Sequence, residues 1–149
     1  MTIRALESRD EEAILAIQAA CPEIAQWTAW DYDRVARGEM AGWVAEEDAG
    51  VTGFLIARRL SSELEILNFA VESDSRRCGI GAALLVAALQ WAQTFRATHA
   101  ILEVRASNLA ALHFYERYKF EVAGRRPRYY TAPVEDALLL TATLVVLGP

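Results

Sequence analysis

The sequence predicts a mixed α/β fold in which one mixed sheet carries helices on both faces. Apolar strand-like segments follow one another in the middle of the chain, and strands alternate with helices after them. A meander followed by strand–helix–strand crossovers produces a sheet of this kind. A glycine-containing turn between a strand and the longest helix fits the same architecture. Because no repeat, low-complexity tract or linker divides the 149 residues, we expect residues 1–149 to form a single domain.

The first half of the chain is expected to form three strands and two helices. Ser8 followed by Glu11 predicts a capping box for the first helix, which Pro22 ends. Thr28 with Asp31 predicts the cap of the second helix. The expected helices are 8–20 and 28–37, and the expected strands are 2–6, 42–47 and 51–59, with Asp48-Ala49-Gly50 as a hairpin turn between the last two.

The second half alternates buried-looking strands with helices. Residues 80–89 are apolar apart from one glycine and open the longest helix, which is expected to continue to about residue 95. A short helix is expected at 108–117. The expected strands are 63–71, 100–104, 120–126 and 137–144.

Composition favours an ordinary soluble globular protein. Hydrophobic residues make up 54% and charged residues 23% of the chain, and the net charge is −5. Nucleic-acid binding calls for a basic surface, and a membrane-spanning helix would be longer than 80–89, so we expect neither partner. Charged residues interrupt the N-terminal segment, unlike a signal peptide. Cys21 and Cys78 lack the spacing of a disulfide framework or a metal site, so we expect a cytoplasmic protein without a metal.

The turn before the longest helix predicts an anion site. A strand that ends in such a turn points several backbone N–H groups toward the helix N-terminus, where the helix dipole adds positive potential. Gly79 and Gly81 carry no Cβ and allow close approach, while Arg76 and Arg77 add charge. A phosphate is therefore the expected ligand. The alternative is a plain helix start with glycines for tight packing.

Two neighbouring motifs resemble those of the GNAT superfamily of acetyltransferases. Arg76-Arg77-Cys78-Gly79-Ile80-Gly81-Ala82 is similar to the R-x-x-G-x-G/A pyrophosphate loop of that superfamily. The segments 102–108 and 110–116 resemble the ribosomal-protein alanine N-acetyltransferase branch, as do Arg128-Tyr129-Tyr130 and Glu135-Asp136-Ala137. The resemblance implies about seven mostly antiparallel strands with about four helices, and two central strands that splay apart.

The resemblance also implies that acetyl-coenzyme A (acetyl-CoA) is the cosubstrate. Its pyrophosphate would lie on the glycine turn, and its pantetheine arm would pair with the strand edge like an added strand. Asn108 would contact this arm from the start of the following helix. The implied binding residues are Phe69, Ala70, Val71, Arg76, Arg77, Cys78, Gly79, Ile80, Gly81, Ala82 and Asn108.

In the branch that this chain resembles, residues at the positions of Glu103 and Tyr115 are the general base and the general acid. Glu103 alternates with Ile101 and Arg105 on one strand face and can point into a cleft. Tyr115, with a reference pKa of about 10, stays protonated at neutral pH and can donate to a departing thiolate. The alternatives are a strand carboxylate paired with Arg105 for Glu103, and a core aromatic beside Phe114 for Tyr115.

A weak carboxylate base suits an α-amine acceptor better than a lysine. At pH 7, an α-amino group of pKa about 7.8 costs about 1 kcal/mol to deprotonate, and a lysine of pKa about 10.4 costs about 4.6 kcal/mol. This favours the N-terminus of a protein as the acceptor without excluding lysine, and the resemblance to the ribosomal-protein branch implies a ribosomal or similar protein. We expect residues 22–31 to shape the acceptor groove. The alternatives are a small-molecule amine acetyltransferase and a non-catalytic acyl-CoA-binding module.

One residue departs from the family pattern beside the expected acid. Lys119 stands where the family usually has a glycine before the sixth strand. We expect it either to adopt a left-handed conformation or to reshape the turn next to Tyr115.

Overall fold

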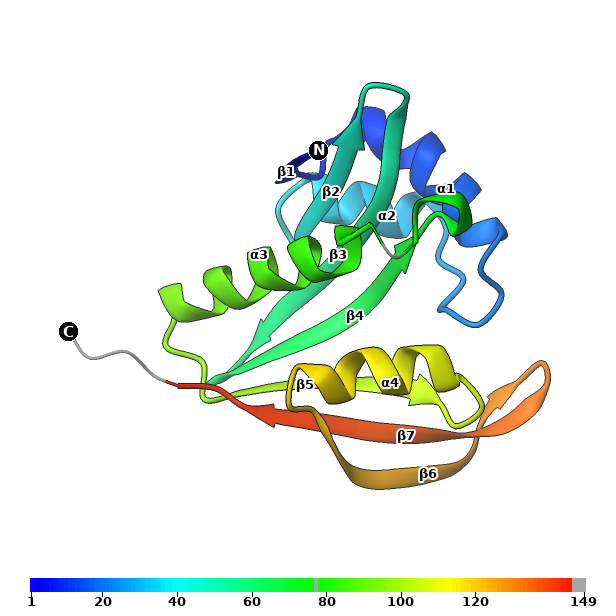
Figure 1. Ribbon diagram of the computed structural model, residues 1–149, viewed down its shortest axis with the longest axis vertical. Helices are drawn as coiled ribbons and strands as arrows, with labels where there is room; N and C mark the ends of the chain where they lie inside the picture. The colour runs from blue at the N-terminus through cyan, green and yellow to red at the C-terminus, as the bar shows by residue number, and fades with distance from the viewer. Residues whose placement is uncertain (77, 146–149) are drawn as a thin grey trace.

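A seven-stranded sheet in the order β1-β2-β3-β4-β5-β7-β6 forms the centre of the protein. The computed structural model describes residues 1–76 and 78–145 (Figure 1). β4 pairs with β5 in parallel and the other neighbours pair antiparallel, which confirms the predicted mixed, mostly antiparallel sheet. The strands are β1 (Thr2–Ala5), β2 (Ala41–Glu47), β3 (Gly50–Leu60), β4 (Glu63–Val71), β5 (His99–Arg105), β6 (Glu121–Thr131) and β7 (Val134–Thr143).

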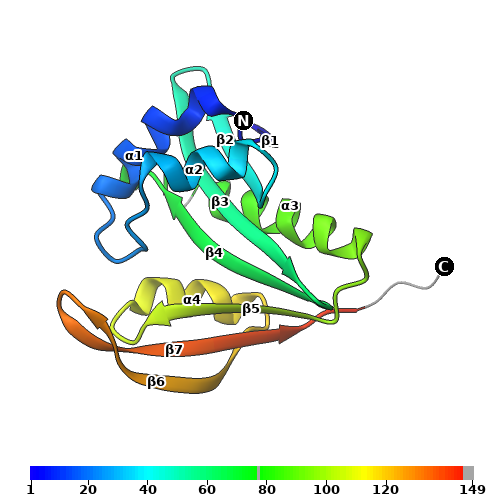
Figure 2. The same ribbon diagram turned by 180° about the vertical axis from the view of Figure 1, so that it is seen from behind.

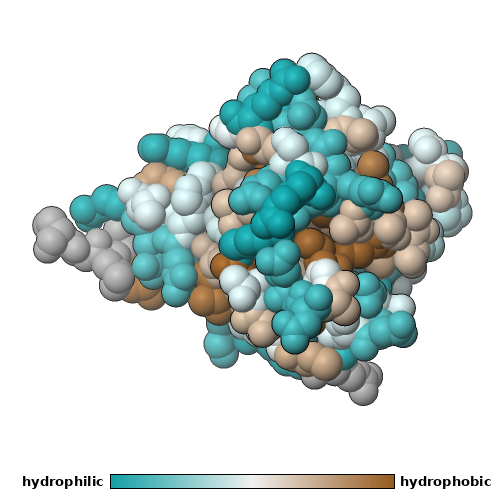
Figure 3. Space-filling model, turned by 90° about the horizontal axis from the view of Figure 1, so that it is seen from above, coloured by the Kyte–Doolittle hydropathy of each residue, from teal (hydrophilic) through white to brown (hydrophobic). Residues whose placement is uncertain are grey.

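Helices cover both faces of the sheet, as predicted. Figures 1 and 2 show α1 and α2 on one face, and α3 and α4 on the other. Seen from above, hydrophilic side chains are spread over the surface, with hydrophobic surface between them (Figure 3). The helices are α1 (Glu11–Ala19), α2 (Ala29–Ala36), α3 (Ile80–Thr94) and α4 (Leu109–Arg117), with 3₁₀ turns at Ser8–Asp10 and Ser73–Ser75.

β3 separates two hydrophobic cores. Because side chains alternate along a strand, Phe54 and Ile56 pack with α1 and α2, whereas Leu55 and Ala57 pack with α3. All four side chains are inaccessible to solvent. Burial on both faces explains why this strand is a continuous apolar run in the sequence.

β4 and β5 separate after a short parallel pairing. Their register ends at Glu65 opposite Ile101. Beyond that point, residues 66 and 68–71 of β4 pair with β3 on one side, and no described strand pairs with them on the other. The predicted splay of the two central strands is therefore present.

A β-bulge at Leu67 reverses the faces of the sheet to which the side chains in the second half of β4 point. The pairing with β3 skips this residue. In a regular strand Ile66 and Asn68 would share one face. Here Ile66 packs in the core under α3, whereas Asn68 donates hydrogen bonds to Ala25 and Tyr32 on the opposite face. The bulge thus directs Asn68 toward α1 and α2.

The first helix begins differently from the prediction. The predicted capping box of Ser8 with Glu11 is wrong, because Ser8 opens a 3₁₀ turn and α1 begins at Glu11. Instead, the Asp10 carboxylate accepts the Glu7 N–H at 2.8 Å and two hydrogen bonds from Arg4, each also at 2.8 Å. The capping box is thus formed by Glu7 and Asp10, one residue before the predicted pair, and Arg4 of β1 adds a partner for Asp10.

The predicted boundary that differs most is the end of β6. This strand continues to Thr131 instead of ending at 126. By contrast, the predicted capping box of α2, formed by Thr28 and Asp31, is present. β6 is an edge strand with almost every residue exposed, and register shifts interrupt its pairing with β7. It therefore lacks the apolar alternation from which strands are predicted.

Three helices end with a residue in the left-handed conformation. After α4, the Lys119 N–H donates to the Glu116 carbonyl at 3.0 Å, and the Phe120 N–H donates to the Tyr115 carbonyl at 3.1 Å. These two bonds define a Schellman motif. Lys119 thus follows the first of its two predicted alternatives. The left-handed residues are Gly38 (φ 89°) after α2, Arg96 (φ 56°) after α3 and Lys119 (φ 71°) after α4.

Replacing Lys119 with glycine should stabilise the protein. Lys119→Gly should raise the free energy of unfolding by about 0.5–1 kcal/mol, because glycine adopts positive φ without the steric cost of a Cβ. Denaturant titration measures this change. Gly38→Ala is the matched control and should lower stability, since its Cβ would meet nothing within 4 Å and only backbone strain is added. A Lys119→Gly protein no more stable than the parent would contradict the strain argument.

Candidate active site

A cavity of about 350 Å³ lies where β4 and β5 part. One wall comes from the α1–α2 loop and β4, and the other from β5, α4 and the end of β6. Four of the predicted site residues line it together: Phe69, Glu103, Asn108 and Tyr115. Further lining residues include Glu23, Ile24, Ala25, Asn68, Tyr129 and Tyr130.

Glu103 reaches the cavity from β5. Burial alternates along β5, with Glu103 on the more open face as predicted. The side chain is 26% exposed and pairs with the Arg126 Nε at 3.1 Å. Arg105 does not take this role, because it pairs with Glu135 at 3.1 Å. The cation that pairs with Glu103 is therefore Arg126 of β6 and not Arg105, the partner in the alternative interpretation.

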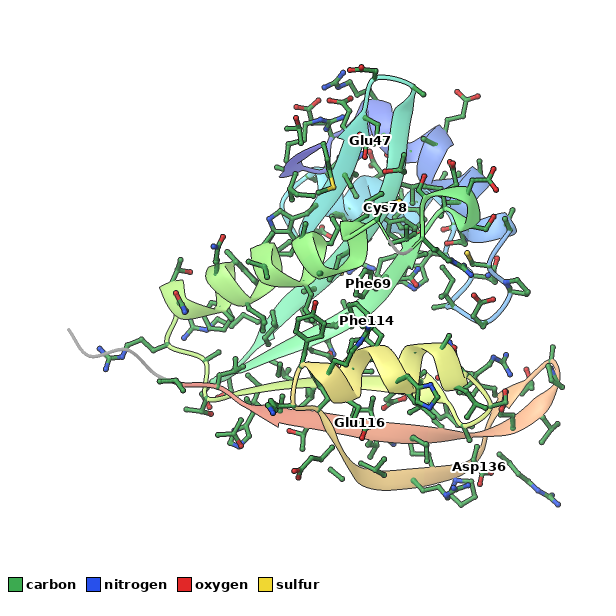
Figure 4. All side chains as sticks on the ribbon, in the orientation of Figure 1. Glu47, Phe69, Cys78, Phe114, Glu116 and Asp136 are labelled. Carbon is green, nitrogen blue, oxygen red and sulfur yellow. The ribbon has the colours of Figure 1, made fainter. Side chains whose placement is uncertain are left out.

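Tyr115 is both a cavity residue and a core aromatic. Only 7% of the residue is exposed, and its ring packs edge-on against Phe69, Phe114 and Phe120. Burial raises the pKa of its hydroxyl, so Tyr115 stays protonated through the neutral range. The Schellman motif at Lys119 places Phe120 against this ring. Phe69 and Phe114 lie between β4 and α4 in Figure 4.

Tyr129 and Tyr130 are cavity residues to which sequence reasoning gave no role. The negative charge of Glu103 raises the pKa of Tyr129, with a further contribution from burial. Burial and then Glu103 raise the pKa of Tyr130, whose ring lies 4.3 Å from the Arg105 guanidinium carbon. The Arg128-Tyr129-Tyr130 motif was the only hint of these residues in the sequence. Its position beside Glu103 depends on the pairing of β7 with both β5 and β6.

The glycine turn opens α3 as predicted. Gly79 is the N-cap of α3 with φ 80°, which favours glycine. A Cβ on Gly81 would lie 3.3 Å from Phe114 Cε1, so this glycine allows α3 to approach α4 closely. Ile80 is 2% exposed, which leaves only its main chain for a ligand. Cys78 is exposed.

Ala82 and Arg77 are two further predicted residues of this turn. Ala82 is half-buried in the first turn of α3. Arg77 lies outside the described residues.

Arg76 folds back toward the α1–α2 loop. Its Nε donates to the Val71 carbonyl at 3.1 Å, and a terminal nitrogen lies 3.3 Å from Cys21 Sγ. The same nitrogen lies 3.6 Å from a Glu23 carboxylate oxygen. Arg76 would have to leave these groups to reach an anion on the turn.

Main-chain groups on the unpaired edge of β4 form hydrogen bonds with side chains. The Phe69 N–H donates to Asn68 Oδ1 at 3.2 Å, and the Val71 carbonyl accepts from Arg76. Strand alternation then directs the main chain of Ala70 toward β3. An added strand would therefore meet the main chain of Phe69 and Val71.

Asn108 caps α4 at the edge of the cavity. Its Oδ1 accepts the Ala111 N–H at 3.2 Å, which orients the side chain at the helix N-terminus. Among residues 1–76 and 78–145, no three His, Cys, Asp or Glu side chains gather in a metal-binding arrangement. Within the same ranges, no helix has the length and apolar character needed to cross a membrane.

Comparison with known proteins identifies the family. Residues 3–120 match the model of the Acetyltransferase (GNAT) family. The chain belongs to the GNAT family. The N-alpha-acetyltransferase of Sulfurisphaera tokodaii is 34% identical over 119 residues, which cover 71% of each chain. The Escherichia coli K12 ribosomal protein bS18-alanine N-acetyltransferase is 34% identical over 96 residues, or 63% of this chain and 65% of the relative.

Solved structures confirm the GNAT fold. The ribosomal-protein-S18-alanine N-acetyltransferase from Escherichia coli has a TM-score of 0.84 and 28% identity, covering 99% of this chain and 96% of its own. Ard1 from Thermoplasma volcanium has a TM-score of 0.82 and 29% identity, covering 99% and 98%. Arabidopsis thaliana NAA60 in complex with acetyl-CoA, 20% identical, has the same fold with a TM-score of 0.85, covering 96% and 98%. The predicted family and acyltransferase class are confirmed.

The contact between Glu103 and Tyr129 can be tested without turnover. Glu103→Gln should lower the pKa of Tyr129, because it removes the negative charge that contributes most to its raised value. Ultraviolet difference titration, with the Tyr129→Phe protein as the background, isolates this group. Glu63→Gln, at the paired end of β4, is the control and should leave the titration unchanged. An unaltered Tyr129 titration in Glu103→Gln would contradict the geometry described.

Proposed function

We propose that this GNAT protein transfers the acetyl group of acetyl-CoA to the N-terminal α-amine of a protein in the cytoplasm, with a ribosomal protein that begins with alanine as the first candidate. The observation that supports this most is the meeting of Glu103 and Tyr115 in one cavity beside the open edge of β4. A module that only binds acyl-CoA has no need of such an acid–base pair. The names of the relatives support the choice of a protein N-terminus.

The residues around the splay fit the proposed cosubstrate. Acetyl-CoA supplies an acetyl group activated as a thioester. Gly79 leaves the N-terminus of α3 uncovered, since a Cβ there would meet nothing within 4 Å, and the N–H groups of this turn would hold the pyrophosphate. The main chain of Phe69 and Val71 would bind the pantetheine arm in exchange for their present side-chain partners.

Glu103 would act as the general base. Its carboxylate would attract the cationic amine and take its proton, directly or through a water molecule. Arg126 holds the same carboxylate at 3.1 Å and would compete with the amine for it. The ion pair with Arg126 would therefore orient the Glu103 carboxylate until an acceptor binds.

Tyr115 would act as the general acid. Its raised pKa keeps the proton on the hydroxyl at neutral pH. The surrounding Phe69, Phe114 and Phe120 fix the ring, which limits the reorientation needed when it donates to the departing thiolate.

Removal of one hydroxyl tests the acid. Tyr115→Phe should lower kcat by about 100-fold or more, the lower end of the contribution expected from general acid catalysis, with little change in acetyl-CoA affinity. Steady-state kinetics and calorimetric titration with acetyl-CoA measure the two quantities. Tyr118→Phe, at the C-cap residue directly after α4 and outside the cavity lining, is the matched control and should keep normal turnover. Undiminished turnover in Tyr115→Phe would reject the role.

An acceptor panel tests the substrate class. Thiol release should be fastest with peptides that begin with alanine. Peptides with a blocked N-terminus and a free lysine should react slowly, because lysine costs about 3.5 kcal/mol more to deprotonate at pH 7. Release with polyamines alone would favour the small-amine alternative. Thermal stabilisation by acetyl-CoA without release from any acceptor would favour the binding module.

A further inference from the structure

A chain of buried polar side chains runs from Asn68, which lines the cavity, to Tyr32 and Gln18 outside the lining, next to the α1–α2 loop, residues 20–28. Asn68 Nδ2 donates to the Tyr32 hydroxyl oxygen at 3.0 Å. The Tyr32 hydroxyl in turn donates to Gln18 Oε1 at 2.5 Å. The three residues are 4%, 0% and 5% exposed, respectively. They link β4, α2 and α1 in one hydrogen-bonded path.

Both ends of this path hold the main chain of the α1–α2 loop. Asn68 Nδ2 also donates to the Ala25 carbonyl at 3.1 Å. Gln18 accepts the Trp27 N–H at 3.0 Å and donates to the Trp27 carbonyl at 2.8 Å. These side chains thus supply hydrogen-bond partners for main-chain groups that no helix or strand pairs. The loop, which contains no helix or strand, is therefore fixed by side chains.

The α1–α2 loop forms the wall opposite the proposed base. Glu23, Ile24 and Ala25 line the cavity, and Glu103 lines it from the other side. An acceptor bound beside Glu103 in this cavity would therefore face these three residues. The bulge at Leu67 is what turns Asn68 toward the loop instead of toward α3.

We propose that Asn68, Tyr32 and Gln18 are positioning residues that hold the α1–α2 loop in place and thereby set the affinity for the acceptor. Tyr32 and Gln18 lie outside the cavity lining, so they act through the loop and not by contact with the acceptor. Burial raises the pKa of Tyr32, which keeps its hydroxyl available as a donor. The inference rests on the proposed function for the chemistry of the acceptor, but not for the fixing of the loop.

Removal of the central hydroxyl tests the proposal. Tyr32→Phe keeps the ring in the core and removes the link between Asn68 and Gln18. Amide hydrogen exchange across residues 20–28 should become faster, with the rest of the chain unchanged. KM for the best acceptor of the panel should rise about three- to tenfold, the effect of one lost hydrogen bond. The value of kcat should stay the same, since Tyr32 contacts neither Glu103 nor Tyr115.

A second variant and a control separate loop positioning from general destabilisation. Gln18→Met removes both bonds to Trp27 and should accelerate exchange of the loop further. Ile14→Val weakens the same core without touching the hydrogen bonds, and it should leave acceptor KM unchanged. An equal rise in acceptor KM for Ile14→Val would overturn the proposal.

Two other results would also overturn it. Loop exchange that stays slow in both Tyr32→Phe and Gln18→Met would mean that the path does not hold the loop. Faster loop exchange with an unchanged acceptor KM would mean that the loop does not govern affinity. If the panel identifies a small amine, the same comparison uses that amine. The exchange measurement needs no turnover, so failure of the proposed function and failure of the loop-fixing role are distinguishable.

Discussion

The short parallel pairing of β4 with β5 is the constraint on which the rest of the structure depends. The two strands are joined only from Glu63 to Glu65. Past that point the bulge at Leu67 bends β4 and reverses the faces of its side chains. The separation leaves a main-chain edge without a neighbouring strand among the described residues and opens a cavity of about 350 Å³ in the middle of the sheet. A fully paired sheet would have no room for a ligand at this place.

The two walls of the cavity are held by different means. On the β5 side, ion pairs and stacking fix the parts: Arg126 holds Glu103, and Arg105 joins Glu135 and lies over Tyr130. On the β4 side, neutral hydrogen bonds from Asn68 and Gln18 hold the α1–α2 loop, and Arg76 lies 3.6 Å from Glu23 of the same loop. Salt screens exposed ion pairs, whereas neutral hydrogen bonds depend little on it. The partly exposed pair of Arg126 with Glu103 is therefore expected to respond more to salt than the hydrogen bonds of Asn68 and Gln18.

Much of the fold followed from local pattern. Local patterns located all seven strands, although only the first part of β6, and the Thr28–Asp31 box and the glycine turn marked helix starts, because alternation, capping and positive φ are properties of short segments. The exceptions were the Ser8 cap and the end of β6. In the first case the box forms one residue earlier, between Glu7 and Asp10, with Arg4 of β1 bound to Asp10, and in the second case an exposed edge strand carries no periodic signal.

By itself, the sequence determined the order of elements, the glycine turn before α3 and, through motif resemblance, the candidates Glu103 and Tyr115. Only the tertiary structure decided which groups surround them. The pairing of Glu103 with Arg126, the place of Tyr129 and the path from Asn68 to Gln18 join segments that are far apart in the chain. Such contacts depend on strand register, on one inserted residue in β4 and on how helices pack. None of these leaves a mark in the spacing of neighbouring residues.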